Sequence, residues 1–164
     1  MAQGYEQKQI RVPRFSEANG FYTTKQRSEL MSKIRAKDTK PEIRFRAVLW
    51  SMGLRYRKNV KALPGTPDIV MRKYKLVVFI DGEFWHGYQW ETKKAQIKSN
   101  KDFWIPKIER NMQRDKEVNA QLAAMGFYVL RFWNHQIKNE LPYCIGRILE
   151  FTSQDQDIDF SGYY

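Results

Sequence analysis

The spacing of hydrophobic residues along the chain predicts four helices and four strands. Apolar side chains recur every three or four positions in four segments, and the expected helices cover residues 25–37, 40–52, 103–125 and 139–151. Pro106 offers a second starting point for the third of these helices. Shorter apolar segments bounded by Gly, Pro and charged residues predict strands at residues 54–58, 68–71, 76–80 and 127–132.

The second predicted helix has the clearest boundaries. Thr39 stands at its N-terminal cap and Glu42 follows three residues later, which is the capping-box pattern. Gly53 fits just past its last turn. The inward-facing residues of this helix are expected to be Phe45, Val48, Leu49 and Met52.

The segment 76–80 is apolar at every position, which is typical of a central strand buried on both faces. From residue 40 onward the predicted order is helix, three strands, helix, strand, helix. This order indicates an α/β fold with a mixed central sheet flanked by helices. It is similar to the core of the PD-(D/E)xK nuclease superfamily, although a shared fold does not establish shared chemistry.

The ends of the chain differ in character from its middle. Residues 1–22 have no sustained hydrophobic period and are expected to form an arm or a disordered leader. Residues 23–151 are expected to form one nuclease-like domain, since this length suits a single core. Residues 152–164 are polar and acidic, and predict a loose tail.

Charge narrows the choice of partner. Lys and Arg number 29 against 18 Asp and Glu, giving a formal net charge of +11. Such an excess favours nucleic acid or an anionic membrane surface. The sequence has no apolar run long enough to span a membrane, no signal-peptide core and no clear membrane-surface helix. We therefore expect an intracellular, cytoplasmic protein associated with the nucleoid, with double-stranded DNA as its partner.

Carboxylates gather at the ends of two predicted neighbouring strands. Asp68 begins one strand, and Asp81, Glu83 and His86 follow the buried strand 76–80. Carboxylate oxygens are the ligands that Mg²⁺ prefers, and Mg²⁺ can activate water and neutralise a phosphate. The pattern predicts a Mg²⁺-dependent nuclease with Asp68, Asp81 and Glu83 as metal ligands. His86 has the pKa range for proton transfer.

Each of these residues also has a purely structural explanation. Asp68 suits a turn, and Asp81, standing before a glycine, suits a hairpin turn. The capping box accounts for Glu42 without any function, and Glu83 can simply point into solvent. A histidine beside a tryptophan, as His86 is, can be a packed ring.

Basic and aromatic residues are concentrated after residue 82. Exposed rings in a basic protein can stack on bases or wedge between them, and 15% of this chain is aromatic. Lysines in the same region can follow a DNA backbone, and such binding weakens steeply with salt. The residues expected to contact DNA are Phe84, Trp85, Trp104, Lys93, Lys94, Lys98 and Lys101.

A series of motifs over about residues 24–150 resembles the very-short-patch-repair (Vsr-type) DNA mismatch endonucleases. The motifs are Pro41-Glu42, Leu63-Pro64-Gly65-Thr66-Pro67-Asp68, Phe79 through Gly82, Phe84-Trp85-His86, Phe103-Trp104, Asn111 with Arg114-Asp115, and Gly126 through Leu130. Each fragment is weak alone, but their order and spacing are specific. Members of that family nick one strand beside a T:G mismatch and use Mg²⁺, so the resemblance implies the same activity.

The resemblance also implies roles for individual residues. Asp68 would be the central metal ligand, and Glu42 would orient a metal-bound water. His86 would be the general acid or base near the scissile phosphate, with Asp115 as its polar support. The aromatic residues Phe84, Trp85 and Trp104 fall where the family inserts rings into the base stack.

Two features depart from the family pattern. Where the family binds a structural zinc, this chain has Glu83, Tyr88, Trp90 and His135. With one cysteine, Cys144, and two histidines in the whole chain, no such zinc site is expected. Asp81 stands where the family has a histidine, and it is expected to add a catalytic carboxylate.

The sequence therefore predicts a Mg²⁺-dependent DNA endonuclease that nicks one strand near a T:G mismatch. We expect a monomer, with mismatch-repair proteins as candidate partners. Two alternatives stay open: a restriction-type or structure-selective nuclease of the same superfamily, and a catalytically silent nucleic-acid-binding module.

Overall fold

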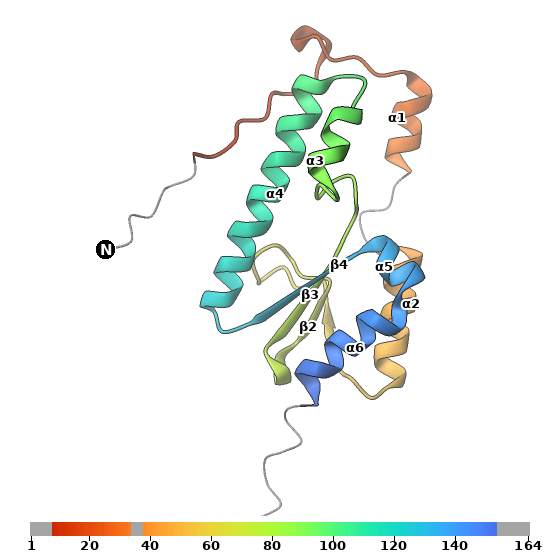
Figure 1. Ribbon diagram of the computed structural model, residues 1–164, viewed down its shortest axis with the longest axis vertical. Coiled ribbons are helices and arrows are strands. Elements are labelled where there is room, and N and C mark those ends of the chain that lie inside the picture. Colours follow the sequence, from red (N-terminus) through yellow and green to blue (C-terminus); the bar gives the residue numbers. More distant parts are fainter. Residues whose placement is uncertain (1–7, 34–37, 154–164) are drawn as a thin grey trace, which may run out of the picture. The chain divides into compact units, whose positions relative to one another are not determined.

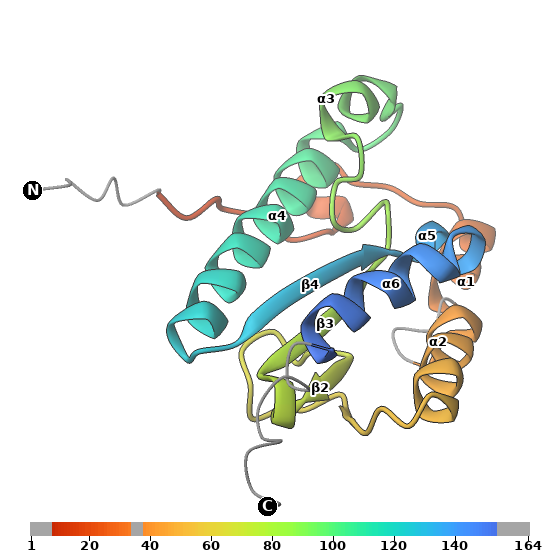
Figure 2. The ribbon, with the colours of Figure 1, turned by 60° about the horizontal axis from the view of Figure 1, so that its bottom comes forward.

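The computed structural model describes residues 8–33 and 38–153, and the chain divides into two compact units (Figure 1 and Figure 2). The helical unit combines Met1–Ile34 with Glu83–Glu117, and the sheet unit combines Arg35–Gly82 with Val118–Tyr164. Each unit is described by itself below. The predicted tail from residue 154 lies outside the described residues.

A four-stranded mixed sheet forms the centre of the sheet unit. Its strands lie in the order β1 (Arg57–Lys58), β2 (Ile69–Met71), β3 (Leu76–Asp81) and β4 (Tyr128–Trp133). The β1–β2 and β2–β3 pairs are antiparallel, and β3–β4 is parallel. The prediction that residues 76–80 form a central strand is confirmed. The strand predicted at 54–58 is mostly wrong, since only an exposed two-residue edge strand forms there.

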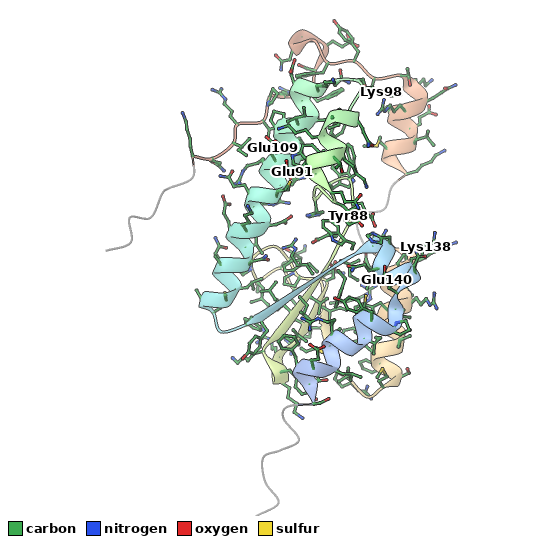
Figure 3. All side chains as sticks on the ribbon, in the orientation of Figure 1. Tyr88, Glu91, Lys98, Glu109, Lys138 and Glu140 are labelled. Atoms are coloured by element: carbon green, nitrogen blue, oxygen red, sulfur yellow. The ribbon has the colours of Figure 1, made fainter. Side chains whose placement is uncertain are left out.

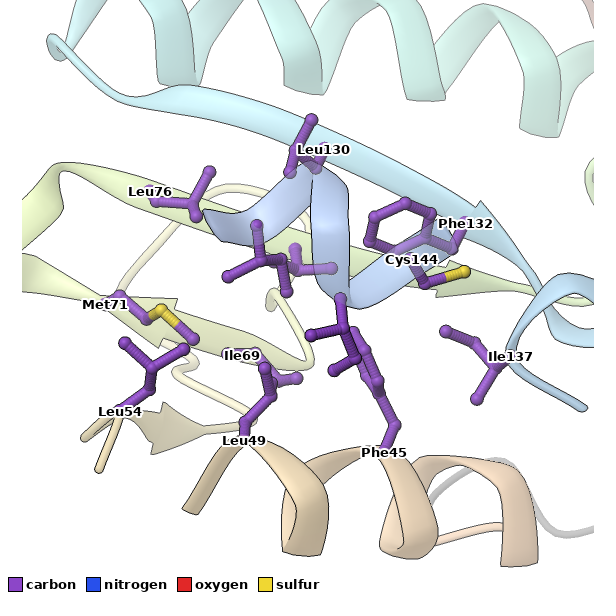
Figure 4. Close-up of a cluster of buried hydrophobic side chains, with 13 residues drawn as sticks. Phe45, Leu49, Leu54, Ile69, Met71, Leu76, Leu130, Phe132, Ile137 and Cys144 are labelled. Carbon is purple, nitrogen blue, oxygen red and sulfur yellow. The ribbon is translucent and has the colours of Figure 1, made fainter. Parts of the chain in front are cut away.

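Three helices of the sheet unit cover one face of the sheet: α2 (Lys40–Ser51), α5 (Asn134–Asn139) and α6 (Leu141–Thr152). Figure 4 shows Phe45 and Leu49 of α2 pointing at the strands, and both side chains are fully buried. Cys144 of α6 is buried in the same cluster. Met52 was predicted to face inward, but it lies past the end of α2 and is exposed.

The short helix α5 was not predicted. Asn134 and His135 are weak helix formers, and Ile137 is the one apolar residue of the helix, so no hydrophobic period marks it. The Gln136 side chain supports its start, because Gln136 Oε1 accepts the Trp133 N–H at 2.9 Å. This places His135 in the first turn of α5 and not in a strand.

The other face of the sheet carries a second apolar cluster. Val118 and Leu122 of α4 (Lys101–Ala124) pack with Val77 and Phe79 of β3. Residues 76 and 78 of the same strand belong to the first cluster, so β3 is buried on both faces by strand alternation. This double burial fixes the position at which β3 ends in Asp81.

The helical unit contains α1 (Lys25–Ser32), α3 (Trp90–Lys93) and most of α4. The helix predicted at 25–37 thus ends at Ser32, and residues 34–37 lie outside the described residues. The third predicted helix begins earlier than expected, at Lys101, and includes Pro106. Short 3-10 turns occur at Glu17–Asn19, Arg72–Tyr74 and Lys94–Gln96. No helix in the described ranges is long and apolar enough to cross a membrane.

The described part of the N-terminal segment, residues 8–22, makes specific contacts with α4 and the residue before it. Gln113 accepts the Ile10 N–H at 3.1 Å and donates to the Lys8 carbonyl at 3.2 Å. Asn100 in the same way accepts from the Tyr22 N–H and donates to the Tyr22 carbonyl. Two side-chain amides therefore bind the backbone of this segment at both ends.

We predict that Gly65→Ala destabilises the protein more than Gly126→Ala. Both glycines have positive φ, so alanine at either position costs about 1 kcal/mol of backbone strain. A Cβ at Gly65 would also lie 2.6 Å from Val118 Cγ1 and 3.2 Å from the Phe79 ring, whereas nothing lies within 4 Å at Gly126. Overpacking should raise the loss in unfolding free energy for Gly65→Ala to about 3 kcal/mol. Urea denaturation of both variants measures the difference, and equal losses would contradict the clash.

Candidate active site

Asp68 lies at the junction between a tight turn and β2. Leu63 and Pro67 of the turn are buried, so the turn is anchored on the sheet. The Asp68 side chain is partly buried, and its Oδ2 accepts the Ile80 N–H of β3 at 2.7 Å. One backbone donor thus fixes this carboxylate beside the end of the central strand.

The surroundings of Asp68 raise its pKa to about 6. Burial is the largest cause, and the nearby carboxylates of Glu42 and Asp81 raise the pKa further. The Ile80 N–H and the charge of Arg46 act in the opposite direction. Three of the predicted site carboxylates therefore lie within electrostatic range of one another, and their mutual repulsion favours a proton or a cation at Asp68.

Glu42 serves the helix cap, as the capping box predicts. Its Oε1 accepts from the Thr39 hydroxyl at 2.9 Å, and its Oε2 accepts the Asp38 N–H at 2.9 Å. Arg46 Nη1 lies 3.6 Å from Glu42 Oε2, and Arg46 also pairs with Asp38. The carboxylate is buried and held in place, so a catalytic role for it would add to a structural role.

Asp81 forms a two-pronged ion pair that was missed in the sequence. Arg131 donates from Nε to Asp81 Oδ2 at 2.7 Å and from Nη2 to Oδ1 at 2.9 Å. Arg131 also donates from Nη1 to Asn119 at 3.0 Å, and its guanidinium lies 4.5 Å from the centre of the Phe79 ring. The available signal was a single arginine within the otherwise uncharged strand 128–133. As a metal ligand, Asp81 would have to share its oxygens with this guanidinium.

His86 and Asp115 are brought together in the helical unit. His86 Nδ1 lies 2.6 Å from Asp115 Oδ2, and both side chains are largely buried. With its proton on Nδ1, the neutral imidazole donates to Asp115 and carries its lone pair on Nε2. This geometry orients the ring for proton transfer at Nε2, and it gives Asp115 a partner other than the neighbouring Arg114 or Lys116.

The three predicted metal ligands do not lie in one unit. Asp68 and Asp81 belong to the sheet unit, whereas Glu83 belongs to the helical unit. Within residues 8–33 and 38–153, no group of three or more His, Cys, Asp or Glu side chains is arranged to hold a metal ion. The donors around Asp68 are all carboxylate oxygens, which fit Mg²⁺ and not a thiolate-preferring metal.

At the family's zinc-ligand positions, two side chains make packing and hydrogen-bond contacts with neighbouring residues. Trp90 is buried, and its Nε1 donates to Glu109 Oε1 of α4 at 3.2 Å. Lys94 donates to the same oxygen at 2.6 Å, and Lys93 lies over the Tyr88 ring. These contacts hold α3 on α4, and Figure 3 shows Tyr88, Glu91 and Glu109 in this unit.

Four aromatic rings of the helical unit form one cluster, which we term the aromatic cluster: Phe84, Trp85, Phe103 and Trp104. Phe84 lies 5.3 Å from both tryptophan rings, and Trp104 lies 4.9 Å from Phe103. Phe84 is 47% exposed, so the cluster has an accessible edge. Phe15 and Phe21 of the N-terminal segment extend the cluster through Phe103, and these two rings were missed in the sequence.

The predicted DNA-binding lysines fall at different places in the helical unit. Lys93 and Lys98 line a cavity together with Phe84 and Trp104. Lys94 pairs with Glu109, and Lys101 is exposed at the first residue of α4. Two of the four lysines thus lie beside the aromatic cluster.

The chain is similar to known DNA endonucleases. Residues 19–92 match the family model described as DNA mismatch endonuclease Vsr. A type II nicking enzyme of Neisseria meningitidis serogroup C, V.NmeDIP, is 44% identical over 83% of this chain and 92% of its own length. Another, V.HpaIIP of Haemophilus parainfluenzae, is 51% identical over 70% of this chain and 82% of its own.

The name of a third relative is the same as the description of the family model. The DNA mismatch endonuclease Vsr of Escherichia coli (strain K12) is 36% identical over 65% of this chain and 68% of its own length. The mixed sheet is consistent with this similarity and with the matches to the two nicking enzymes. The chain therefore belongs to the DNA mismatch endonuclease Vsr family of DNA endonucleases.

Proposed function

We propose that this endonuclease uses Mg²⁺ to nick one strand of double-stranded DNA beside a mismatch, with T:G as the first candidate. The observation that carries the proposal is Asp68, held by the Ile80 N–H among carboxylates that raise its pKa. Relatives named as a mismatch endonuclease and as nicking enzymes support the choice of reaction. One site on a monomer, which the sequence predicts, suits a single-strand cut.

Asp68 is the residue best suited to hold the cation. Ionised Asp68 supplies a fixed oxygen ligand, and a divalent cation there would offset the repulsion from Glu42 and Asp81. When bound, Mg²⁺ supplies water activation and charge neutralisation at the phosphate. In the proposal Glu42 orients the attacking water, and Asp81 and Glu83 are additional ligands. Arg131 offsets the negative charge of Asp81.

His86 is proposed to move the proton. Asp115 holds the imidazole by its Nδ1, so Nε2 is the atom that accepts or delivers a proton at the phosphate. The aromatic cluster is proposed to enter the base stack, where a mismatch lowers the cost of unstacking. The +11 charge supports binding to the DNA backbone, with Lys93, Lys94, Lys98 and Lys101 as contacts. Recruitment by mismatch-repair proteins stays a prediction.

We predict that Asp68→Asn abolishes Mg²⁺-dependent cleavage and leaves DNA binding intact. The amide keeps the size of the side chain and an oxygen for the Ile80 N–H, but it removes the negative charge that a cation needs. Cleavage of matched and T:G-mismatched duplexes, within a pool of flanking sequences, measures the effect. Asp102→Asn is the control, because Asp102 is an exposed acid outside the proposed site. Cleavage that persists in Asp68→Asn would contradict the role of Asp68.

We also predict a pH-dependent stability cost at Asp68 in the metal-free protein. Its pKa is about 6 when folded and near 3.8 when unfolded, so the folded state binds the proton more tightly. Stability is therefore lost as pH rises from about 4 through about 6 and is level above about 7. The unfolding free energy of Asp68→Asn, relative to that of the parent, should rise by about 1.3 kcal/mol between pH 5 and pH 7.

Denaturant unfolding of the parent and Asp68→Asn at several pH values measures this cost. At pH 7, added Mg²⁺ should stabilise the parent and not Asp68→Asn, because only the parent has the full ligand charge. Parallel curves for the two proteins would contradict the raised pKa.

We predict that Phe84→Ala combined with Trp104→Ala removes mismatch discrimination. Base stacking on such rings contributes about 1–3 kcal/mol per base, so preference for the mismatched duplex should fall by about tenfold or more. The ratio of cleavage rates on mismatched and matched duplexes measures the change. Tyr143→Ala, an exposed aromatic on α6, is the control. Cutting of matched DNA by the parent would instead favour a restriction-type or structure-selective enzyme.

A further inference from the structure

The outer face of α2, in the sheet unit, carries an exposed apolar stripe. Ile43, Ala47 and Trp50 are spaced four and three residues apart, so they lie on one side of the helix. Ile43 and Trp50 are 51% and 52% exposed, whereas Phe45 and Leu49 on the opposite side are fully buried. A surface helix normally has a polar outer side. Because α2 is apolar on both sides, its outer face is a candidate contact surface.

This stripe lines a groove of about 610 Å³, which we term the α2 groove. Tyr56 also lines the groove, and its ring packs edge-on against Trp50 with the ring centres 6.0 Å apart. The Tyr56 hydroxyl donates to the Arg46 carbonyl at 2.9 Å, which fixes the tyrosine side chain. All described residues that line the α2 groove belong to the sheet unit. The groove is therefore a feature of that unit alone.

The charge around the α2 groove is mainly positive. Arg46 and Lys58 line it, and the Arg55 guanidinium lies 4.0 Å from the centre of the Trp50 ring. Arg55 Nη1 also donates to the Trp50 carbonyl at 3.1 Å. Asp38 is the one acidic side chain among the described lining residues, and it pairs with both Arg46 and Lys58. Apolar surface with an excess of positive charge is complementary to a peptide that is both apolar and acidic.

The last residues of this chain have that composition. Residues 154–164, which lie outside the described residues, contain three aspartates and no Lys or Arg, in a chain of net charge +11. Within them, Asp157-Ile158-Asp159-Phe160 alternates acidic and apolar side chains. Alternate side chains of an extended peptide point to opposite sides. An extended backbone would therefore present Ile158 and Phe160 to one surface and leave both carboxylates beside it.

The segment is also long enough to reach the α2 groove. Helix α6 ends at Thr152, and α2 and α6 pack on the same face of the sheet. Figure 1 and Figure 2 show both helices running from α5 toward the same end of the sheet unit. Eleven extended residues span about 36 Å, and a domain of about 100 residues has a radius of gyration of about 13 Å. Residues 154–164 can thus reach the outer face of α2 while α6 stays folded.

We propose that residues 154–164 bind in the α2 groove of the same chain. Ile158 and Phe160 contact Ile43 and Trp50, and the aspartates lie beside Arg55 and Lys58. Binding removes the exposed apolar stripe from water and offsets part of the positive charge of α2. The inference does not depend on the proposed nicking reaction, because none of these contacts involves DNA or a metal ion.

Photocrosslinking within the full-length protein tests the inference. The photoreactive amino acid p-benzoylphenylalanine replaces Phe160, and mass spectrometry identifies the segment to which it crosslinks. We expect a crosslink within one chain to residues 40–56. The same amino acid in place of Tyr143, an exposed aromatic on α6, is the control for non-specific reaction and should not give this crosslink.

Substitutions in the groove and in the segment should each lower the yield of this crosslink about fivefold. Trp50→Ala removes apolar contact, and Lys58→Glu reverses a charge at an exposed position. Asp155→Asn, Asp157→Asn and Asp159→Asn together remove the negative charge without changing the sheet unit. Tyr143→Ala is the matched control for Trp50→Ala and should keep the yield of the parent. Thermal unfolding followed by circular dichroism checks that each variant is folded.

Three results would overturn the inference. The first is the absence of a crosslink from position 160 to residues 40–56. The second is a crosslink between two chains, which would make the α2 groove a contact between copies. The third is a yield that is unchanged when the three aspartates are replaced. Failure of the proposed function appears separately, in the cleavage assays, because the crosslinking needs neither DNA nor Mg²⁺.

Discussion

The pairing of β3 with its two neighbours is the constraint on which the positions of the candidate site carboxylates in the sheet unit depend. Antiparallel pairing with β2 brings Asp68 to the Ile80 N–H, and parallel pairing with β4 places Arg131 beside Asp81. Because β3 is buried on both faces, a shift of its register by one residue would exchange the two apolar clusters. The apolar core therefore fixes the position of the carboxylates.

The helical unit is built around α4 by different means. Side-chain amides of Gln113 and Asn100 bind the backbone of the N-terminal segment, and Glu109 binds Trp90 and Lys94. Rings then connect the N-terminal segment to the aromatic cluster through Phe103. The exposed edge at Phe84 is thus supported by contacts that begin far away in the sequence.

Local patterns in the sequence predicted the sheet, its central strand and the capping box of α2, and they indicated the candidate site residues, whose roles stay predictions. Contacts between distant residues could not be predicted in this way. The pairing of Arg131 with Asp81 requires knowledge that β3 and β4 are parallel and in a given register. Helix α5 has no hydrophobic period that could have predicted it. The contacts of residues 8–22 depend on the side-chain amides of Gln113 and Asn100, and nothing in the sequence distinguishes these two residues from other exposed polar residues.

The ion pair between Asp81 and Arg131 also constrains how the sequence can change. Both side chains are largely buried, so removing either charge leaves the other without its partner in a poorly hydrated place. A histidine at position 81, which the family pattern has, could not accept both donors of an arginine at position 131. The two positions must therefore change together, and a single substitution at either one passes through a less stable intermediate. Sequence change at this edge of the sheet is therefore expected to occur by paired substitutions at positions 81 and 131.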